Sequence, residues 1–230
     1  MQDKEKVDFN EYAREYEKIL DNDLKFFGEH VGYFAEYKVK IVKETLHRSP
    51  VKILEYGCGI GLNLRYFRKH FPQVEISGCD ISQSSIDVAS RQNSGSELFI
   101  IDPENLKLRK EKYDLIFVSC VFHHIAPELR AESFSYITNL LKPGGEFYIF
   151  EHNPYNPVTR RIVRDCIWDK DAILLKPKET EKLMKDAGLT IIQKKYTLFF
   201  PAKLNFVRTV EKLLGNIPVG GQYYIKGMKK

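Results

Sequence analysis

The chain has 230 residues, of which 43% are hydrophobic and 29% charged, with 15 Phe and 13 Tyr. This composition supports a sizeable core and excludes disorder over most of the chain. The 36 basic and 31 acidic residues give a formal charge of +5, without the dense basic stripe of a nucleic-acid binder. The sequence contains neither a run of about 20 apolar residues nor a signal-peptide core, and its four cysteines are widely separated. We therefore expect a single cytoplasmic domain (1–230) without metal, nucleic acid or transmembrane segment, although contact with a membrane surface stays open.

The first 49 residues predict helices, which we expect to form an N-terminal cap (1–49). Charged and apolar residues follow helical spacing over 9–20, and a second such stretch covers 33–46. Ser49-Pro50 should end this second helix, because the residue before a proline resists the α region.

Residues 50–153 alternate between short apolar runs and amphipathic stretches. Five strands are expected, at 51–57, 73–80, 97–102, 113–120 and 145–152. Helices are expected between them over 62–70, 82–93 and 128–141, and KPGG at 142–145 predicts a helix stop followed by a turn. Strands that alternate with crossover helices form a parallel sheet that is buried on both faces.

The pattern changes after Asn153. NPYNP interrupts regular structure, and a basic amphipathic piece follows over 158–168, within an expected insertion after the fifth strand (154–176). The C-terminal part (177–230) predicts a helix over 178–187, strands over 190–200 and 222–228, and a short helical run over 206–214. We find no linker between these parts, which favours one domain.

The most informative segment is VKILEYGCGIGLN, in which an apolar strand leads directly into Gly57, Gly59 and Gly61. Without Cβ atoms, such a loop can turn tightly and a ligand can approach its backbone. The dinucleotide fingerprint GxGxxG differs, because its last glycine would fall at Leu62. Glu55, two residues before the loop, repels a pyrophosphate and suits a ligand with an ammonium or sulfonium charge.

This loop resembles the signature of the class I S-adenosylmethionine-dependent methyltransferases of the type 11/12 branch. Later segments are similar to the same pattern: the second strand ends at Asp80-Ile81, the third leads into Asp102-Pro103, and the fourth reads YDLIFVSCVFHHI. LLKPGGEFYIFE resembles the family's entry into the fifth strand. The resemblance covers about residues 50–152 and the C-terminal helix and strands. It implies a Rossmann-like, doubly wound, seven-stranded α/β sheet that is mostly parallel, with the last strand antiparallel.

The resemblance also implies a site for S-adenosyl-L-methionine, with S-adenosyl-L-homocysteine as the product. Asp80 would accept both ribose hydroxyls, Ile81 would pack on the adenine, and Asp102 would accept from the adenine amino group. The other implied cofactor contacts are Glu55, Gly57, Cys58, Gly59, Gly61, Pro103, Ser119 and, from the cap, Tyr12 and Tyr16. Structural alternatives stay open: Asp80 could cap a helix, Asp102 could form a turn, and the two tyrosines could pack in the core.

Candidate acceptor-side residues lie at the carboxyl ends of the strands, where open α/β sheets bind ligands. His124 and His152 are candidate catalytic bases, because histidine is readily poised near neutral pH. A reaction without a dedicated base is the alternative. We expect His123 and Glu151 to line the acceptor side.

Three arginines in the insertion suggest the charge of the acceptor. Arg160, Arg161 and Arg164 would place two or three guanidinium groups near one helix face, which suits a phosphate or carboxylate; a solvated surface is the bland alternative. We expect a small-molecule acceptor, with a phosphorylated or lipid-linked sugar-type metabolite as one candidate, and O-methylation ahead of N-methylation. The alternatives to a methyltransferase are a catalytically silent scaffold that binds S-adenosylmethionine and a nicotinamide-binding Rossmann oxidoreductase.

Overall fold

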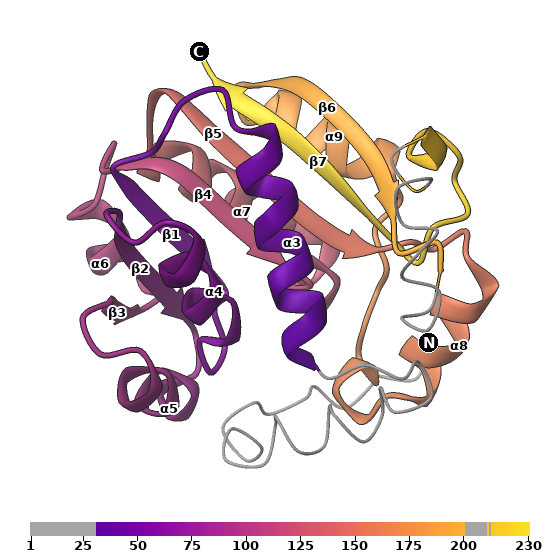
Figure 1. The fold of residues 1–230 in the computed structure, drawn as a ribbon, viewed down its shortest axis with the longest axis horizontal. Coiled ribbons are helices and arrows are strands. Elements are labelled where there is room, and N and C mark those ends of the chain that lie inside the picture. Colours follow the sequence, from indigo (N-terminus) through magenta and orange to yellow (C-terminus); the bar gives the residue numbers. More distant parts are fainter. Residues whose placement is uncertain (1–30, 201–210, 212) are drawn as a thin grey trace.

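The computed structural model describes residues 31–200, 211 and 213–230 of the chain. A seven-stranded sheet forms its centre, with the strand order β3-β2-β1-β4-β5-β7-β6 (Figure 1). The strands are β1 (Lys52–Tyr56), β2 (Glu75–Asp80), β3 (Glu97–Ile100), β4 (Tyr113–Ser119), β5 (Leu141–His152), β6 (Leu189–Thr197) and β7 (Gln222–Lys229). Strands β1 to β5 are parallel, whereas β7 runs antiparallel to both β5 and β6.

Helices cover both faces of this sheet. One face carries α3 (Val31–Thr45), α4 (Leu62–His70) and α5 (Gln83–Gln92), which contribute Val42, Phe67 and Ile86 to one buried cluster. The other face carries α6 (Pro103–Lys107), α7 (Pro127–Leu140) and α9 (Pro177–Asp186), which contribute Leu106, Phe134 and Met184 to a second cluster. The expected doubly wound, Rossmann-like fold with an antiparallel last strand is thereby confirmed.

The apolar runs of the central strands explain how one sheet serves two cores. Successive side chains of a strand point to opposite faces. In β1, Ile53 joins the cluster under α3 and α4, while Leu54 joins the cluster under α7. Leu115 and Ile116 of β4 divide in the same way. A strand buried on both faces needs apolar residues at consecutive positions, which is why periodicity of two is missing from these segments.

Two local predictions are wrong. KPGG at 142–145 lies inside β5 instead of forming a separate turn, because Leu141 already pairs with Tyr113 and the extra residues bulge before Glu146 pairs with Leu115. The basic helix of the insertion is shorter than expected: α8 (Pro157–Asp165) ends early, and the turn η3 (Ile167–Asp169) follows it.

Other expectations fall in part outside the described residues. The first cap helix, with Tyr12 and Tyr16, lies outside them, as does most of the predicted helical run at 206–214. The second cap helix is present as α3, which runs across one face of the sheet (Figure 1). Among the described residues, no helix combines the length and the apolar character needed to cross a bilayer.

Candidate functional site

The glycine loop between β1 and α4 is left-handed at all three glycines, with φ of 73° at Gly57, 51° at Gly59 and 80° at Gly61. A side chain at Gly57 would collide with Val121, and one at Gly61 would collide with the Asn93 amide. A Cβ at Gly59, in contrast, would meet no described atom within 4 Å. Two of the glycines therefore serve packing as well as the turn, and the third leaves open space beside the loop backbone.

Glu55 is a buried carboxyl directly beneath this loop, with 1% of its surface exposed. Its Oε1 accepts a hydrogen bond from the Asn63 side chain, whereas Oε2 has no hydrogen-bond partner among the described residues. Burial raises the pKa of Glu55 to about 8. A buried carboxylate oxygen without a partner is unfavourable, so the position is suited to a ligand that brings positive charge or a donor.

Asp80 ends β2 opposite the loop and ties the two together. Its Oδ2 accepts from the Gly59 backbone N–H at 2.8 Å and its Oδ1 from the Ser82 N–H at 3.0 Å. Burial raises the pKa of Asp80. The helix cap is supplied by Ser82, whose hydroxyl accepts from the Ser85 N–H, so Asp80 itself is not the cap of α5. Ile81 beside it is 64% exposed, as an apolar face for a ring would be.

Asp102 follows β3 and begins α6. One of its carboxylate oxygens accepts from the Asn105 backbone N–H at 2.9 Å, and the other is bonded by the Asn105 side-chain amide. Pro103 occupies the first turn of the helix, where a missing N–H costs nothing. Asp102 thus caps α6 and its carboxylate is engaged within the chain, while its predicted contact with adenine stays a prediction.

A buried lysine, Lys38 of α3, reaches the end of β4. Its ammonium donates to Ser119 Oγ at 2.6 Å and lies 3.7 Å from Cys120 Sγ. Cys120 has a left-handed backbone with φ of 57°, and the Gln222 amide donates to its sulfur at 3.3 Å. Burial opposes the thiolate, but the charges of Lys38 and His152 lower the pKa of the Cys120 thiol to about 6.

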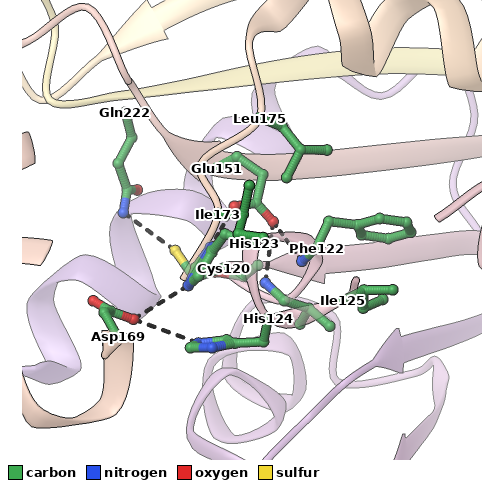
Figure 2. Close-up of polar contacts among 12 residues, drawn as sticks. Cys120, Phe122, His123, His124, Ile125, Glu151, Asp169, Ile173, Leu175 and Gln222 are labelled. Atoms are coloured by element: carbon green, nitrogen blue, oxygen red, sulfur yellow. Dashed lines mark hydrogen bonds and ion pairs between the residues drawn. The ribbon is translucent and has the colours of Figure 1, made fainter. Parts of the chain in front are cut away.

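Histidines and carboxylates gather where β4 and β5 end, as Figure 2 shows. His123 Nδ1 is 2.6 Å from Glu151 Oε2, and its Nε2 is 3.3 Å from Asp169 Oδ1. His124 Nε2 lies 3.4 Å from the same Asp169 oxygen, and His124 Nδ1 lies 3.1 Å from Asp171 Oδ1. We call His123, His124, His152, Glu151 and Asp169 the histidine cluster; the His152 ring lies 5.0 Å from the His123 ring.

The two neighbouring histidines carry opposite pKa shifts. Burial disfavours the charged form of His123, but Glu151 and Asp169 outweigh it and hold the His123 pKa well above its usual range. Burial and the adjacent His123 charge lower the pKa of His124 to about 4. The pKa of His152 is raised: burial opposes this, and the Cys120 thiolate favours the imidazolium. In the cluster, the His123 ring is therefore charged and the adjacent His124 ring is neutral.

Glu151 and the segment after α8 hold the cluster in place. The second Glu151 oxygen accepts from the backbone N–H groups of Val121 and Phe122 at 3.1 and 2.8 Å, which builds the turn η2 (Phe122–His124). The His123 carbonyl accepts from the Ile173 N–H at 2.8 Å, and Arg130 donates to the Ile173 carbonyl at 2.6 Å. These bonds fix the insertion over the carboxyl end of β4.

The arginines of the insertion lie on the exposed face of α8. The Arg161 and Arg164 side chains are 78% and 70% exposed, and both pair with Asp165. Trp168, in the turn that follows α8, is only 3% exposed and packs inside. The insertion does contribute to the site, but through residues that the sequence did not single out: Asp169 and Asp171. Lys38, Asn63 and Gln222 were missed as well.

The fold and the loop together define an α/β protein with a glycine-rich loop between the first central strand and its helix. Residues 54–147 match the family described as a methyltransferase domain. This match agrees with the resemblance to the class I S-adenosylmethionine-dependent methyltransferases seen in the sequence and with the cofactor that it implies.

Relatives share this similarity in sequence, and solved structures share the fold. A demethylmenaquinone methyltransferase of Thermotoga maritima is 26% identical over 154 residues, covering 67% of this chain and 63% of that protein. A malonyl-[acyl-carrier protein] O-methyltransferase of Ilyobacter polytropus is 36% identical over 47% of this chain and 41% of its own length. The chain thus spans less than two thirds of the length of either relative. The fold resembles that of a SAM-dependent methyltransferase from Archaeoglobus fulgidus, with a TM-score of 0.69 and 16% identity over 90% of this chain and 97% of that one.

Proposed function

We propose that this chain transfers the methyl group of S-adenosylmethionine to an oxygen of a small-molecule acceptor. One observation supports this above the others: Gly57 of the loop packs against Val121, the residue that leads into the turn of His123 and His124. A donor held along the loop and an acceptor held at the histidine cluster would therefore meet at this junction. The loop spacing favours this over a nicotinamide-binding oxidoreductase, and formation of a labelled product would distinguish it from a silent scaffold.

The cofactor would lie along the carboxyl ends of β1 and β2. We infer that Glu55 Oε2 receives the positively charged methionine end, that Asp80 holds the ribose, and that Ile81 packs on the adenine. Gly57, Cys58, Gly59, Gly61, Asp102, Pro103 and Ser119, with Tyr12 and Tyr16, complete the proposed cofactor contacts. For Asp80, the ribose hydroxyls would join the backbone N–H groups that its oxygens already accept from.

Methyl transfer from a sulfonium depends mainly on the alignment of donor and acceptor, because the sulfide leaving group is neutral and needs no stabilisation. Holding donor and acceptor in line lowers the barrier by about 7–11 kcal/mol. A hydroxyl acceptor also gains about 10²–10⁴-fold from a group that takes its proton. His124 and His152 are the proposed groups by position, since both lie at the strand ends beyond Ser119, with His123 and Glu151 lining the same side.

An anionic portion of the acceptor is proposed to contact Arg160 and Arg164 on α8. The test replaces Arg160, Arg161 and Arg164 together by Gln and measures acceptor KM at several salt concentrations. We expect a raised KM whose difference from wild type shrinks with salt, because exposed charges are screened over about 10 Å at 0.1 M, and a cofactor dissociation constant within about twofold of wild type. Wild-type kinetics at every salt concentration would leave these arginines as a solvated surface.

The acceptor itself is sought by incubating the protein with methyl-labelled S-adenosylmethionine and a metabolite extract, followed by mass spectrometry. We expect a labelled O-methyl product whose yield falls with Asp80→Ala. Label on nitrogen would overturn the proposed O-methylation, and cofactor binding without any labelled product would favour the scaffold.

A further inference from the structure

The histidine cluster has a geometry that its role as acceptor-side lining does not require. One ligand-type atom each from His123, His152 and Asp169 lies within 4.8 Å of the other two. The edge between His123 Nε2 and Asp169 Oδ1 is 3.3 Å. Two ligands bound at 2.0–2.1 Å in a tetrahedral site lie about 3.4 Å apart, so this edge already has the length that a bound ion imposes.

We propose that His123, His152 and Asp169 form a binding site for a divalent transition-metal ion, Zn²⁺ in the first instance. Two imidazoles and one carboxylate are a donor set that suits such ions, whereas Mg²⁺ and Ca²⁺ prefer oxygen ligands throughout. Three protein ligands also leave a coordination position for an exogenous group, as in catalytic zinc sites.

The surroundings of the three ligands match what metal sites need. Metal-binding histidines direct their second ring nitrogen at a carboxylate or carbonyl, which fixes the ring and its tautomer. His123 Nδ1 lies 2.6 Å from Glu151, and both side chains are only 1% exposed. His124 lies next to the ligating carboxylate, with its Nε2 3.4 Å from the Asp169 oxygen that also faces His123. His124 in turn is oriented by Asp171.

The position of the site indicates what the open coordination position would take. It lies at the carboxyl ends of β4 and β5, on the acceptor side of the proposed transfer. An oxygen of the acceptor, a hydroxyl or a phosphate, would complete the coordination, and this step alone rests on the proposed function. In that arrangement His152 holds the ion, and His124 remains the base candidate beside it.

The sequence prediction of no metal rested on the wide separation of the four cysteines. The three ligands are far apart in the chain, in η2, at the end of β5 and in η3. Only the fold, with the insertion fastened over β4, brings Asp169 to the two histidines. Figure 2 shows Asp169 beside His123.

Metal binding is tested directly, without reference to methyl transfer. The untagged full chain is freed of metal by chelator dialysis and titrated with Zn²⁺ by calorimetry, and with Co²⁺ while its visible absorption is recorded. We expect one ion per chain and a Co²⁺ spectrum of a four- or five-coordinate N/O site, displaced by Zn²⁺ but not by excess Mg²⁺. No saturable Zn²⁺ binding, or displacement by Mg²⁺, would overturn the proposal.

Variants then assign the ligands. Asp169→Asn and His152→Gln should each weaken Zn²⁺ binding by more than 100-fold, and Asp171→Asn, acting through His124, by less than either ligand variant. Glu151→Gln should weaken it by about 10–100-fold, as loss of an outer partner does. The matched control is His70→Gln: like His124, His70 is 16% exposed and pairs with a carboxylate, but it lies on α4. Unchanged Zn²⁺ affinity in both Asp169→Asn and His152→Gln would refute the assignment.

Each variant is also titrated with S-adenosylhomocysteine. A dissociation constant within about twofold of wild type shows that the variant is folded. The same titration separates the metal-site proposal from the proposed function. A variant that loses Zn²⁺ binding but still binds S-adenosylhomocysteine bears on the metal site alone. Failure of the wild-type protein to bind S-adenosylhomocysteine bears on the proposed function alone.

Discussion

Glu55 offers a quantitative test of how the cofactor is recognised. Its pKa of about 8 means that only about a tenth of the chains carry the carboxylate at pH 7. A ligand cation placed at Oε2 favours the ionised form, so binding of S-adenosylmethionine should release a proton from Glu55. Ionising the group at pH 7 costs about 1.4 kcal/mol, equivalent to about tenfold in affinity, and this cost disappears above the pKa.

The perturbation is Glu55→Gln, and the assay is calorimetry at pH 7 in two buffers of different ionisation enthalpy. Wild type should release close to one proton per bound cofactor, and Glu55→Gln close to none. Loss of a charged contact is worth about 1.5–3 kcal/mol, so the variant should bind about 10–100-fold more weakly at pH 8.5. At pH 7 the wild-type advantage should shrink by about tenfold, because wild type alone must ionise the group there.

The control is Glu97→Gln in β3. Ion pairs with Arg109 and Lys112 outweigh its burial and lower the pKa of Glu97, so it is already ionised at pH 7 and should leave proton release unchanged. Equal proton release by wild type and Glu55→Gln would refute the reasoning, because the proton would then come from elsewhere.

Three further predictions concern the same half of the site. The pKa of Glu55 is higher in the folded protein than in the unfolded chain, so its contribution to stability is present at low pH and is lost as pH rises towards 8. Between pH 5 and 8, the unfolding free energy of the cofactor-free wild type should therefore fall by up to about 1.4 kcal/mol per pH unit more than that of Glu55→Gln. Urea denaturation at several pH values measures this difference. Gly59→Val should abolish cofactor binding with the fold retained. The control is Gly188→Val, because Gly188 also has a positive φ and a Cβ added there would meet no described atom within 4 Å. This variant should bear a similar backbone strain and leave the cofactor dissociation constant unchanged. Asp80→Ala should weaken cofactor binding by about 10–100-fold, one charged acceptor being worth about 1.5–3 kcal/mol; an unchanged constant in a folded variant would remove Asp80 from the site.

The part of the site that local sequence could predict is the part built from consecutive residues. A strand that runs into alternating glycines and then an amphipathic stretch specifies β1, the loop and α4, and the predicted helix over 62–70 matches α4 at both ends. The position of Glu55 next to the loop could be predicted for the same reason, because β1 fixes its distance from the loop. Backbone geometry links these residues directly, so no tertiary information is needed.

The residues that were missed reach the site from distant elements. Lys38 comes from α3, Asp169 from the turn after α8, and Gln222 from the first position of β7. Each is an ordinary polar residue in its own segment, and nothing in its neighbours distinguishes it from a solvated side chain. The arginines of α8 show the converse. Helical spacing predicted that they share a face, but only tertiary packing determines that this face is exposed.

The proposed cofactor half and the proposed acceptor half of the site differ in how far the hydrogen bonds of their polar groups are already satisfied within the chain. In the cofactor half, a carboxylate oxygen of Glu55 is buried with no partner among the described residues, and Gly59 borders open space. In the acceptor half, Glu151 satisfies two backbone N–H groups and His123 at once, and Asp169 bridges two histidines. A cationic cofactor would therefore supply the partner that Glu55 lacks, whereas an acceptor would have to compete with hydrogen bonds that are already made. This asymmetry favours binding of the cofactor first, with the acceptor entering a cluster whose geometry is already set.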